Sequence, residues 1–414
     1  MVTSNQQLFN ERVKRIKDAI ELRKPDRVPI SIPFSYFPAK FTGTVTPKDS
    51  WYDFKKWKEA YFKTADYYQP DACGLAYNNS GKVLEAVGSK TLVWPGHGVS
   101  IHHSHQFVEG EYMKADEYDL FINDLSDYLV RYFLPRTYGL LEPLKHLPPL
   151  ANLAGGLPFA NLATPEFADM TVKLLEIAKE AVIWSKEVVQ MSQEMNDRGY
   201  LGRGLFLTSM AGLVPFDTLS DSFRGMRGAM LDMYRQPDKL LAAINKLSDM
   251  QIKTIAAAPQ ATAFTTTFIP LHRGSDGFMS LKQFEIFYFP YLKRLVEALV
   301  AKGYTPHIFF EGDYTQRLEY LRQLPKGKVW ALFDRPDMKK AKEVLNGHMC
   351  ISGNMPSSIL QTGTVDDVKK ACKWLIDVVG KDGGYIMAPG SSVDEAKPEN
   401  MKAMVEFTKE YGRY

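Results

Sequence analysis

The chain has 414 residues, and its 51 lysines and arginines are nearly balanced by 48 aspartates and glutamates, which leaves a formal net charge of +3. Its 45% hydrophobic and 24% charged shares are typical of a globular protein. Because the charges are balanced and no run of five basic residues occurs, binding to nucleic acid or to a membrane surface is disfavoured. A small-molecule substrate is the favoured ligand.

The cysteines and the N-terminal segment indicate the compartment. Cys73, Cys350 and Cys372 include no CxxC pair and cannot form a disulfide framework, which fits a reducing environment. Residues 1–29 carry charges throughout and lack the apolar core of a signal peptide, and no stretch of about 18 uncharged apolar residues follows. We expect a cytoplasmic protein that does not span a membrane.

Predicted strands and helices alternate along most of the chain. The first half contains a helix at 6–23, a strand at 28–34, a helix at 51–66, a strand at 71–77, a hairpin within 90–107, helical segments at 123–144, a strand at 148–156 and a helix from Pro165 to about 195. The second half contains strands at 204–209, 263–269, 305–310, 329–334, 348–353 and 384–390, with helices at 219–257, 280–302, 315–323, 336–346, 364–379 and from Pro398.

This alternation predicts the α/β class with a parallel sheet. Eight or nine strand–helix units fit a closed (β/α)8 barrel better than an open sheet, because no GxGxxG turn follows the first strand. We expect residues 1–414 to form one barrel domain, which includes the helix at 6–23 and the hairpin insertion at 90–107 as a lid.

The active site of such a barrel forms at the carboxyl ends of the strands. The polar residues at the predicted strand ends are Tyr36, His272, Arg273, Glu311, Asp313, Asp334, Arg335, Asn354 and Ser391. His307 joins them because it shares a strand face with Glu311. We assign catalysis to Glu311, Asp334 and His272, since carboxylates and histidine can exchange protons. Substrate binding is assigned to the other residues.

Some of these candidates have structural alternatives. Glu311 or Asp313 could cap the following helix, and the loop 270–278 could be a solvated turn rather than an anion-binding loop. Asp337 is assigned to the start of the next helix, where negative charge is favoured. Cys350 lies deep in its strand and is expected to fill space.

The hairpin contains four of the eight histidines, at positions 97, 102, 103 and 105. A metal needs three or four ligands, but an extended strand brings only two of these side chains together, which favours an exposed hairpin face. No GxxxxGK[ST], HExxH, GxSxG or SxxK spacing occurs, so nucleotide triphosphates and the common hydrolase reactions are disfavoured.

Five segments stand out in order along the chain: ERVKRIKDAIELRKPDRVPI, SLKQFEIFYFPYLKRLVEAL, FFEGDYTQRLEYL, AKEVLNGHMCISGNMPSSILQTGTVDDV and GGYIMAPGSSVDEAKPENMKAM. Together they resemble the uroporphyrinogen decarboxylase superfamily, which includes the cobamide-dependent methyltransferases. The resemblance covers nearly the whole chain and is strongest over 280–412. It implies a (β/α)8 barrel with its pocket at the carboxyl-terminal rim.

The chain departs from the decarboxylases of this superfamily after the first strand. The resemblance implies an arginine-rich segment like RQAGRY there, which binds the acidic groups of the porphyrinogen, with an essential aspartate close behind. This chain instead has SIPFSYFPAKFTG, in which Lys40 is the only cation and after which the next aspartate is Asp49. Decarboxylation of a porphyrinogen is therefore not expected.

The chain also departs from the thiol-directed methyltransferases, which hold zinc through an H-x-C pair and a later cysteine in a segment like APGC. Here FFEGD places Glu311 at the cysteine position, or Phe309 if the alignment starts from His307, and APGS places Ser391 at the last cysteine position. No thiolate zinc site is expected, and metal binding stays open. The ligands of a bound metal would be Glu311, Asp313 and Asp334.

The resemblance implies a methyltransferase that exchanges a methyl group between a corrinoid and a small molecule, such as a methoxyl compound, a methylamine or a pterin. The chain has no D-x-H-x-x-G segment to bind cobalt, so the corrinoid would be carried by a separate protein. The alternatives are a carboxy-lyase acting on another carboxylate and a non-catalytic ligand-binding barrel. The sequence does not decide the oligomeric state, for which a homodimer is one alternative.

Overall fold

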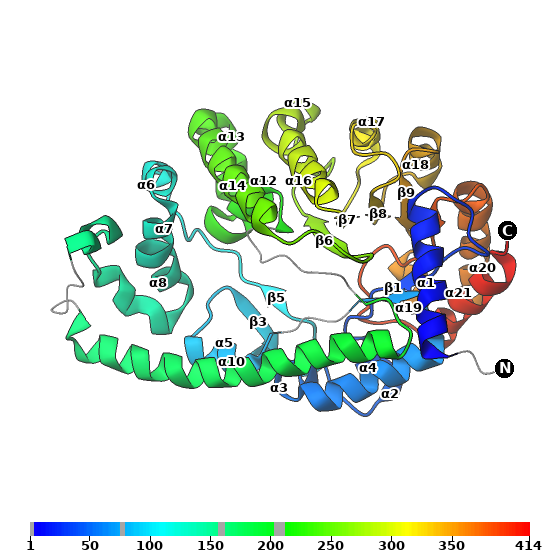
Figure 1. Cartoon of the computed structure of the whole chain (residues 1–414), viewed down its shortest axis with the longest axis horizontal. Helices are drawn as coiled ribbons and strands as arrows, with labels where there is room; N and C mark the ends of the chain where they lie inside the picture. The colour runs from blue at the N-terminus through cyan, green and yellow to red at the C-terminus, as the bar shows by residue number, and fades with distance from the viewer. Residues whose placement is uncertain (1–3, 75–78, 156–161, 203–211) are drawn as a thin grey trace.

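The computed structural model describes residues 4–74, 79–155, 162–202 and 212–414. Helices surround a parallel sheet in this part of the chain (Figure 1). None of the described helices is long and apolar enough to cross a membrane.

The central sheet has five parallel strands in chain order: β6 (Thr266–Leu271), β7 (Thr305–Phe310), β8 (Trp330–Phe333), β9 (Cys350–Gly353) and β10 (Tyr385–Ile386). A second parallel pair consists of β1 (Ser31–Ile32) and β2 (Ala72–Cys73). A parallel bridge from Ile30 to Met387 connects this pair to the β10 side, and Leu201 forms a parallel bridge to Ala72.

These pairings confirm the predicted α/β class with a parallel sheet. The strand predicted at 204–209 and the end of the strand predicted at 71–77 lie outside the described residues. Closure of the sheet into a barrel therefore stays a prediction.

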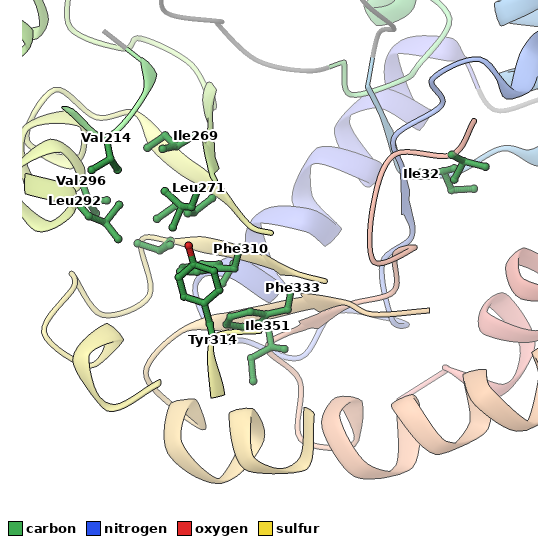
Figure 2. Close-up of a cluster of buried hydrophobic side chains, with 14 of the residues drawn as sticks. Ile32, Val214, Ile269, Leu271, Leu292, Val296, Phe310, Tyr314, Phe333 and Ile351 are labelled. Atoms are coloured by element: carbon green, nitrogen blue, oxygen red, sulfur yellow. The ribbon is translucent and has the colours of Figure 1, made fainter. Parts of the chain in front are cut away.

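The sheet has an apolar layer beneath its helices. Phe310 of β7 and Phe333 of β8 are fully buried, and their rings stack with centroids 4.8 Å apart. Figure 2 shows both rings among buried side chains that include Leu292 of a covering helix. Since side chains alternate along a strand, His307 and Phe309 face the opposite side of β7, where they line an interior cavity.

The helices follow the predicted order. The α-helices are α1 (Asn5–Ile20), α2 (Phe37–Thr42), α3 (Asp49–Tyr52), α4 (Phe54–Tyr68), α5 (Gly81–Val87), α6 (Tyr118–Asn123), α7 (Leu125–Tyr128), α8 (Leu134–Thr137), α10 (Pro165–Asp197), α12 (Pro215–Thr218), α13 (Gly225–Arg235), α14 (Pro237–Ala257), α15 (Leu281–Gln283), α16 (Phe289–Ala301), α17 (Leu318–Leu321), α18 (Met338–Leu345), α19 (Ser357–Thr362), α20 (Val365–Leu375) and α21 (Pro398–Tyr411). The 3-10 and π segments are η1 (Leu129–Phe133), η2 (Gly139–His146), η3 (Leu150–Gly155), η4 (Leu219–Phe223), η5 (Phe284–Tyr288), η6 (Thr315–Arg317) and η7 (Ile376–Gly380).

Local capping explains where several helices begin. The side chain of Thr164 caps α10, and Ser280 and Thr364 form capping boxes with Gln283 and Asp367. Asp337 accepts a hydrogen bond from the backbone of Lys340 at the start of α18. The predicted helix starts at these positions are confirmed.

The predicted hairpin is present as an antiparallel pair of β3 (Leu92–Pro95) with β5 (Gln106–Phe107), joined by a segment that contains β4 (Gly98–Val99). Two contacts attach it to the carboxyl ends of the strands. The Tyr36 hydroxyl lies 2.7 Å from His105 Nδ1, and Ser104 donates a hydrogen bond to Asp394.

Two strand predictions need correction. Residues 148–156 were expected to form a strand, but Leu150–Gly155 form the 3-10 helix η3, because this segment has two prolines at its start and no β-branched residue. β6 begins at Thr266 rather than at Ala263, because Ala263 lies in a turn where its carbonyl accepts from the Thr265 hydroxyl.

Candidate active site

His272 lies directly after β6 and contacts carboxylates on two sides. Its Nδ1 is 2.5 Å from Asp221 Oδ2, and its Nε2 is 3.9 Å from Glu311 Oε2. Asp221 comes from η4, and Glu311 follows β7. The His272 side chain is 30% exposed, so the ring is not sealed off from solvent.

The surroundings of His272 determine its charge. Burial alone would lower the pKa of the imidazole, but the hydrogen bond to Asp221 and the charges of Asp217, Asp221 and Glu311 outweigh burial and raise this pKa to about 9. His272 is therefore an imidazolium at neutral pH. Because Asp221 binds Nδ1, the proton on Nε2 is the one available to a ligand.

Asp217 fixes the backbone that carries His272. Its carboxylate is fully buried and accepts hydrogen bonds from the backbone nitrogens of His272 at 3.1 Å and Arg273 at 2.9 Å, and from the Tyr288 hydroxyl at 2.5 Å. Burial raises the pKa of Asp217, which the positive charge of His272 opposes and the negative charge of Asp221 reinforces. Asp217 thus holds the backbone of His272 and Arg273 in position and does not itself face a ligand.

Arg273 pairs with the same carboxylate as His272. Its Nη2 lies 3.1 Å from Asp221 Oδ1, and its Nε donates to Ser220 Oγ at 3.3 Å. Asp221 is therefore held from two directions, which fixes the orientation of its bond to His272. The Arg273 guanidinium already has a carboxylate partner within the chain. Its predicted substrate-binding role stays a prediction.

A second group of predicted residues lies at the ends of β8 and β9. Asp334 Oδ2 accepts from the Gly312 backbone nitrogen at 3.0 Å and lies 3.3 Å from Arg335 Nε. Asn354 Nδ2 donates to the Asp334 carbonyl at 3.1 Å. β7 separates β6 from β8 in the sheet, so Glu311 lies between this group and His272.

Asp313 has the structural role that was predicted as its alternative, at the start of the following helical turn. Its carboxylate accepts from the backbone nitrogen and the hydroxyl of Thr315 at 2.9 and 2.6 Å, at the start of η6. Asp276, in the predicted anion-binding loop, pairs with the buried Arg317 and accepts from the backbone of Gln316. Both carboxylates hold loops in place, Asp313 through Oδ1 and Asp276 through both of its oxygens.

Tyr36 and Ser391 have partners elsewhere at the strand ends. The contact with His105 ties Tyr36, at the first strand end, to the hairpin. Tyr36 also accepts a hydrogen bond from Trp51 Nε1 of α3 at 3.1 Å. Ser391 Oγ lies 3.2 Å from Ser357 Oγ. Neither contact brings these residues to His272.

His307 does not belong to the group at the strand ends. Its ring stacks on Trp330 with centroids 3.9 Å apart and meets the edge of the Phe268 ring at 5.5 Å. Four residues of extended strand separate it from Glu311, a distance of roughly 13 Å. His307 lines an interior cavity of about 40 Å³, which accommodates water but no larger substrate. The predicted substrate-binding role of His307 stays a prediction, for a place inside the sheet rather than at the strand ends.

The residues named as ligands of a possible metal, Glu311, Asp313 and Asp334, do not come together at one point. Within the described ranges, no group of three or more His, Cys, Asp or Glu side chains lies close enough to hold a metal ion. Glu311 points toward His272, Asp313 binds Thr315 and Asp334 binds Gly312. The hairpin histidines diverge as well, since the His97 ring stacks on Trp94 while His105 reaches Tyr36.

Comparisons with known proteins agree with this architecture. A sequence model of the uroporphyrinogen decarboxylase (URO-D) family matches residues 210–411. Relatives include the uroporphyrinogen decarboxylases of Chlorobium luteolum, 27% identical over 43% of this chain and 51% of the relative, and of Anaeromyxobacter sp., 29% identical over 42% of this chain and 49% of the relative. The matched part of the chain thus spans about half the length of these relatives.

A solved structure of a methyltransferase from Methanosarcina mazei is similar over 97% of this chain and 98% of its own, with a TM-score of 0.56 and 16% identity. Over residues 210–411 the chain is similar to the uroporphyrinogen decarboxylase family. The resemblance seen in the sequence is confirmed, and at 16% identity the structural likeness shows the fold alone.

The departures from the superfamily motifs have structural counterparts. Lys40, the only cation in the segment after the first strand, is exposed on α2. The positions that correspond to the zinc cysteines hold Ser391, beside Ser357, and either Glu311, beside His272, or Phe309 if the alignment starts from His307. The candidate site of this chain is therefore centred on a histidine between carboxylates.

Three residues of this centre are absent from those predicted from the sequence: Asp217, Asp221 and Tyr288. The two aspartates are four residues apart in PFDTLSDSF, a spacing that places both on one helix face. That spacing was the available signal. Tyr288 offered none, because it meets Asp217 only through the tertiary fold.

Proposed function

We propose that this chain is a methyltransferase that exchanges a methyl group between a corrinoid on a separate protein and a small molecule. The observation that carries the proposal is the His272–Asp221 pair, which presents a charged imidazole at the end of β6. A corrinoid supplies a cobalt atom that can carry and transfer a methyl group. The residues of this chain bind the small molecule and manage its proton.

The proton is needed because methyl transfer changes the charge of the small molecule. When a methyl ether or methylammonium loses its methyl group, the bonding electron pair stays on oxygen or nitrogen. His272 Nε2–H donates a proton to an oxygen that becomes negative, and Asp221 stabilises the charged imidazole before that transfer. In the reverse direction the neutral imidazole accepts the proton from the acceptor group.

The proposal includes a closed barrel. The interior cavity is lined by Ser31 of β1, Cys73 of β2, Thr266 of β6, His307 of β7 and Ser352 of β9. Strands that surround one common space support closure, because an open sheet would present these faces to different surroundings.

A carboxy-lyase is the second candidate function. The names of the curated relatives favour it, and a charged histidine can also protonate the carbanion left by loss of carbon dioxide. The exposed position of Lys40 argues against a porphyrinogen with many carboxylates, so the substrate would be a smaller acid. A non-catalytic ligand-binding barrel is the third candidate.

The test combines the protein with methylcobalamin, or with reduced cobalamin and methylated donors, and follows the cobalt state by absorbance. We expect a spectral change with at least one small molecule, and we expect His272→Gln to abolish it while the exposed His146→Gln does not. Release of carbon dioxide from a carboxylate panel without cobamide would favour the carboxy-lyase. Ligand binding without any turnover would favour the binding barrel.

A further inference from the structure

The helix α10 has apolar side chains on two sides. It contains 33 residues, which makes it about 50 Å long, and it runs along one side of the molecule (Figure 1). The inner side is buried at Met170, Met191 and Met195, and the helix packs on α5, η2, α1 and α4. The outer side carries large apolar side chains that remain exposed.

The exposed apolar residues define what we call the outer stripe: Val172 at 64%, Leu175 at 58%, Val182 at 54%, Ile183 at 60% and Val189 at 54% exposure. Together with Lys179 and Lys186, four of them, Val172, Leu175, Val182 and Val189, recur at alternating steps of three and four residues, the spacing of a helix that pairs with another helix. Ile183 lies beside Val182 at the edge of this series. A helix that is exposed to water on one side needs no such repeat.

We propose that the outer stripe binds the outer stripe of a second copy of this chain, with the two helices antiparallel and the two-fold axis near Glu180 and Ala181. A two-fold contact requires a surface that complements itself. Reversing the helix about this axis places Val172 opposite Val189, and Leu175 opposite the apolar stem of Lys186. The stripe therefore meets apolar groups along its whole length.

The charges of the stripe also complement each other in this arrangement. Glu176 flanks Leu175, so it comes to lie near Lys186 of the second copy. Within one chain Glu176 contacts Lys179 at 2.9 Å, and Glu180 lies 3.9 Å from Lys82 on α5. Lys186 is the charge that gains a new partner, one at each end of the symmetric contact. A parallel arrangement would bring each charge next to its own copy.

The flank of the stripe allows the helices to approach closely. Thr171, Ala178 and Ser185 follow one another at seven-residue intervals along one edge. Small side chains at such positions let two helices pack with a short separation. The residues at the ends of β6 and β7 come from other segments, so this inference does not depend on the proposed function.

The first experiment measures the molar mass of the full chain in solution by analytical ultracentrifugation over a range of concentrations. We expect two 47.0 kDa chains per particle. Val182→Glu combined with Ile183→Glu should raise the dissociation constant at least tenfold, because it buries carboxylates in the contact. Tyr234→Glu, at a position 76% exposed on α13, is the matched control and should leave the dimer intact. Circular dichroism checks that each variant is folded.

The second experiment tests the antiparallel orientation. Glu176→Lys and Lys186→Glu should each weaken the dimer, by about threefold for an exposed pair, and the double variant should restore it. A thiol cross-linker should join two copies of Ala178→Cys but not two copies of Val172→Cys, because the antiparallel helices place the latter residues about 25 Å apart. The natural cysteines are buried and should not react.

A wild-type chain that is monomeric at all concentrations would overturn the inference, as would a dimer that the Val182 and Ile183 substitutions leave unchanged. Cross-linking of Val172→Cys to itself would overturn the antiparallel arrangement.

Discussion

Two histidines on neighbouring strands differ in what surrounds them. His272 follows β6 and lies between the carboxylates of Asp221 and Glu311, with 30% of its side chain exposed. His307 lies within β7, where its ring stacks on Trp330 inside the sheet. The carboxylates of Asp221 on η4 and Glu311 after β7 give His272 its charge, whereas the aromatic rings around His307 supply packing.

The largest effect that would test this comparison is on His272 itself. His272→Gln removes the group that transfers the proton, so we expect kcat to fall by about 10²–10⁴-fold. The fold should persist, because Asp217 holds the loop through backbone nitrogens that the substitution leaves in place. Methyl-transfer kinetics beside thermal unfolding checks both expectations. A fully active variant would remove His272 from the mechanism.

The opposite result is expected for the histidine inside the sheet. His307→Ala leaves a space beside Trp330 and Phe268, so the free energy of unfolding should fall by about 2–4 kcal/mol. The pH dependence of the remaining activity should stay as in the wild type, because His272 keeps its carboxylates. Denaturant unfolding and a pH profile measure the two effects. An altered profile with unchanged stability would contradict the packing role.

Asp221→Asn sharpens the comparison because it leaves the imidazole of His272 in place and removes its charged partner, which also pairs with Arg273. The substitution removes the hydrogen bond to a charged partner, so the pKa of His272 should fall from about 9 toward its ordinary value. We expect a loss of about 10–100-fold in kcat. We also expect the high-pH limit of activity, near pH 9 in the wild type, to move to lower pH. A limit that stays in place would show that another group sets it.

The same pair predicts the sign of a stability change. The fold raises the pKa of His272, so the charged form favours the folded state. This contribution is complete below about pH 6.5, the ordinary histidine value, and is lost as the pH rises through about 9. Wild type and His272→Gln should therefore approach equal stability at high pH, as urea titrations at several pH values can show.

Glu311→Gln should have a smaller effect. The carboxylate is exposed and lies 3.9 Å from His272 Nε2, too far for a hydrogen bond, so it acts through its charge. We expect a loss of activity of about tenfold or less and little change in stability, because its charge is screened by solvent. Steady-state kinetics at low and high salt checks this, since the difference between wild type and variant should shrink at high salt.

The sequence predicted the parts of this fold that depend on local chemistry. Thr164, Ser280 and Thr364 stand where their hydroxyls cap a helix, and the alternating strand and helix patterns around 305–310 and 336–346 needed no tertiary information. The strand at 148–156 was wrong because apolar character alone does not distinguish a strand from a 3-10 turn.

The site could be predicted only in part. The rule that barrel sites form at strand ends nominates His272, Glu311 and Asp334, which the structure places after the neighbouring strands β6, β7 and β8. It could not find Asp221 or Tyr288, which lie on helices and reach β6 through packing. The shared strand face that linked His307 to Glu311 did not show how deep in the sheet His307 lies.

The smallest effect is expected from a chelator. Thiolate ligands are absent from the superfamily's zinc positions, and in the described part of the chain Glu311, Asp313 and Asp334 turn to separate partners. We therefore expect chelation to leave the melting temperature unchanged, because these carboxylates do not meet at one ligand position, and we expect the isolated protein to carry less than one zinc per chain by elemental analysis. His272→Gln serves as a control, since it should not alter the metal content. One zinc per chain that survives dialysis against chelator would contradict this, and His103 and His105 of the hairpin would then be the first ligands to test, by substitution of each with alanine.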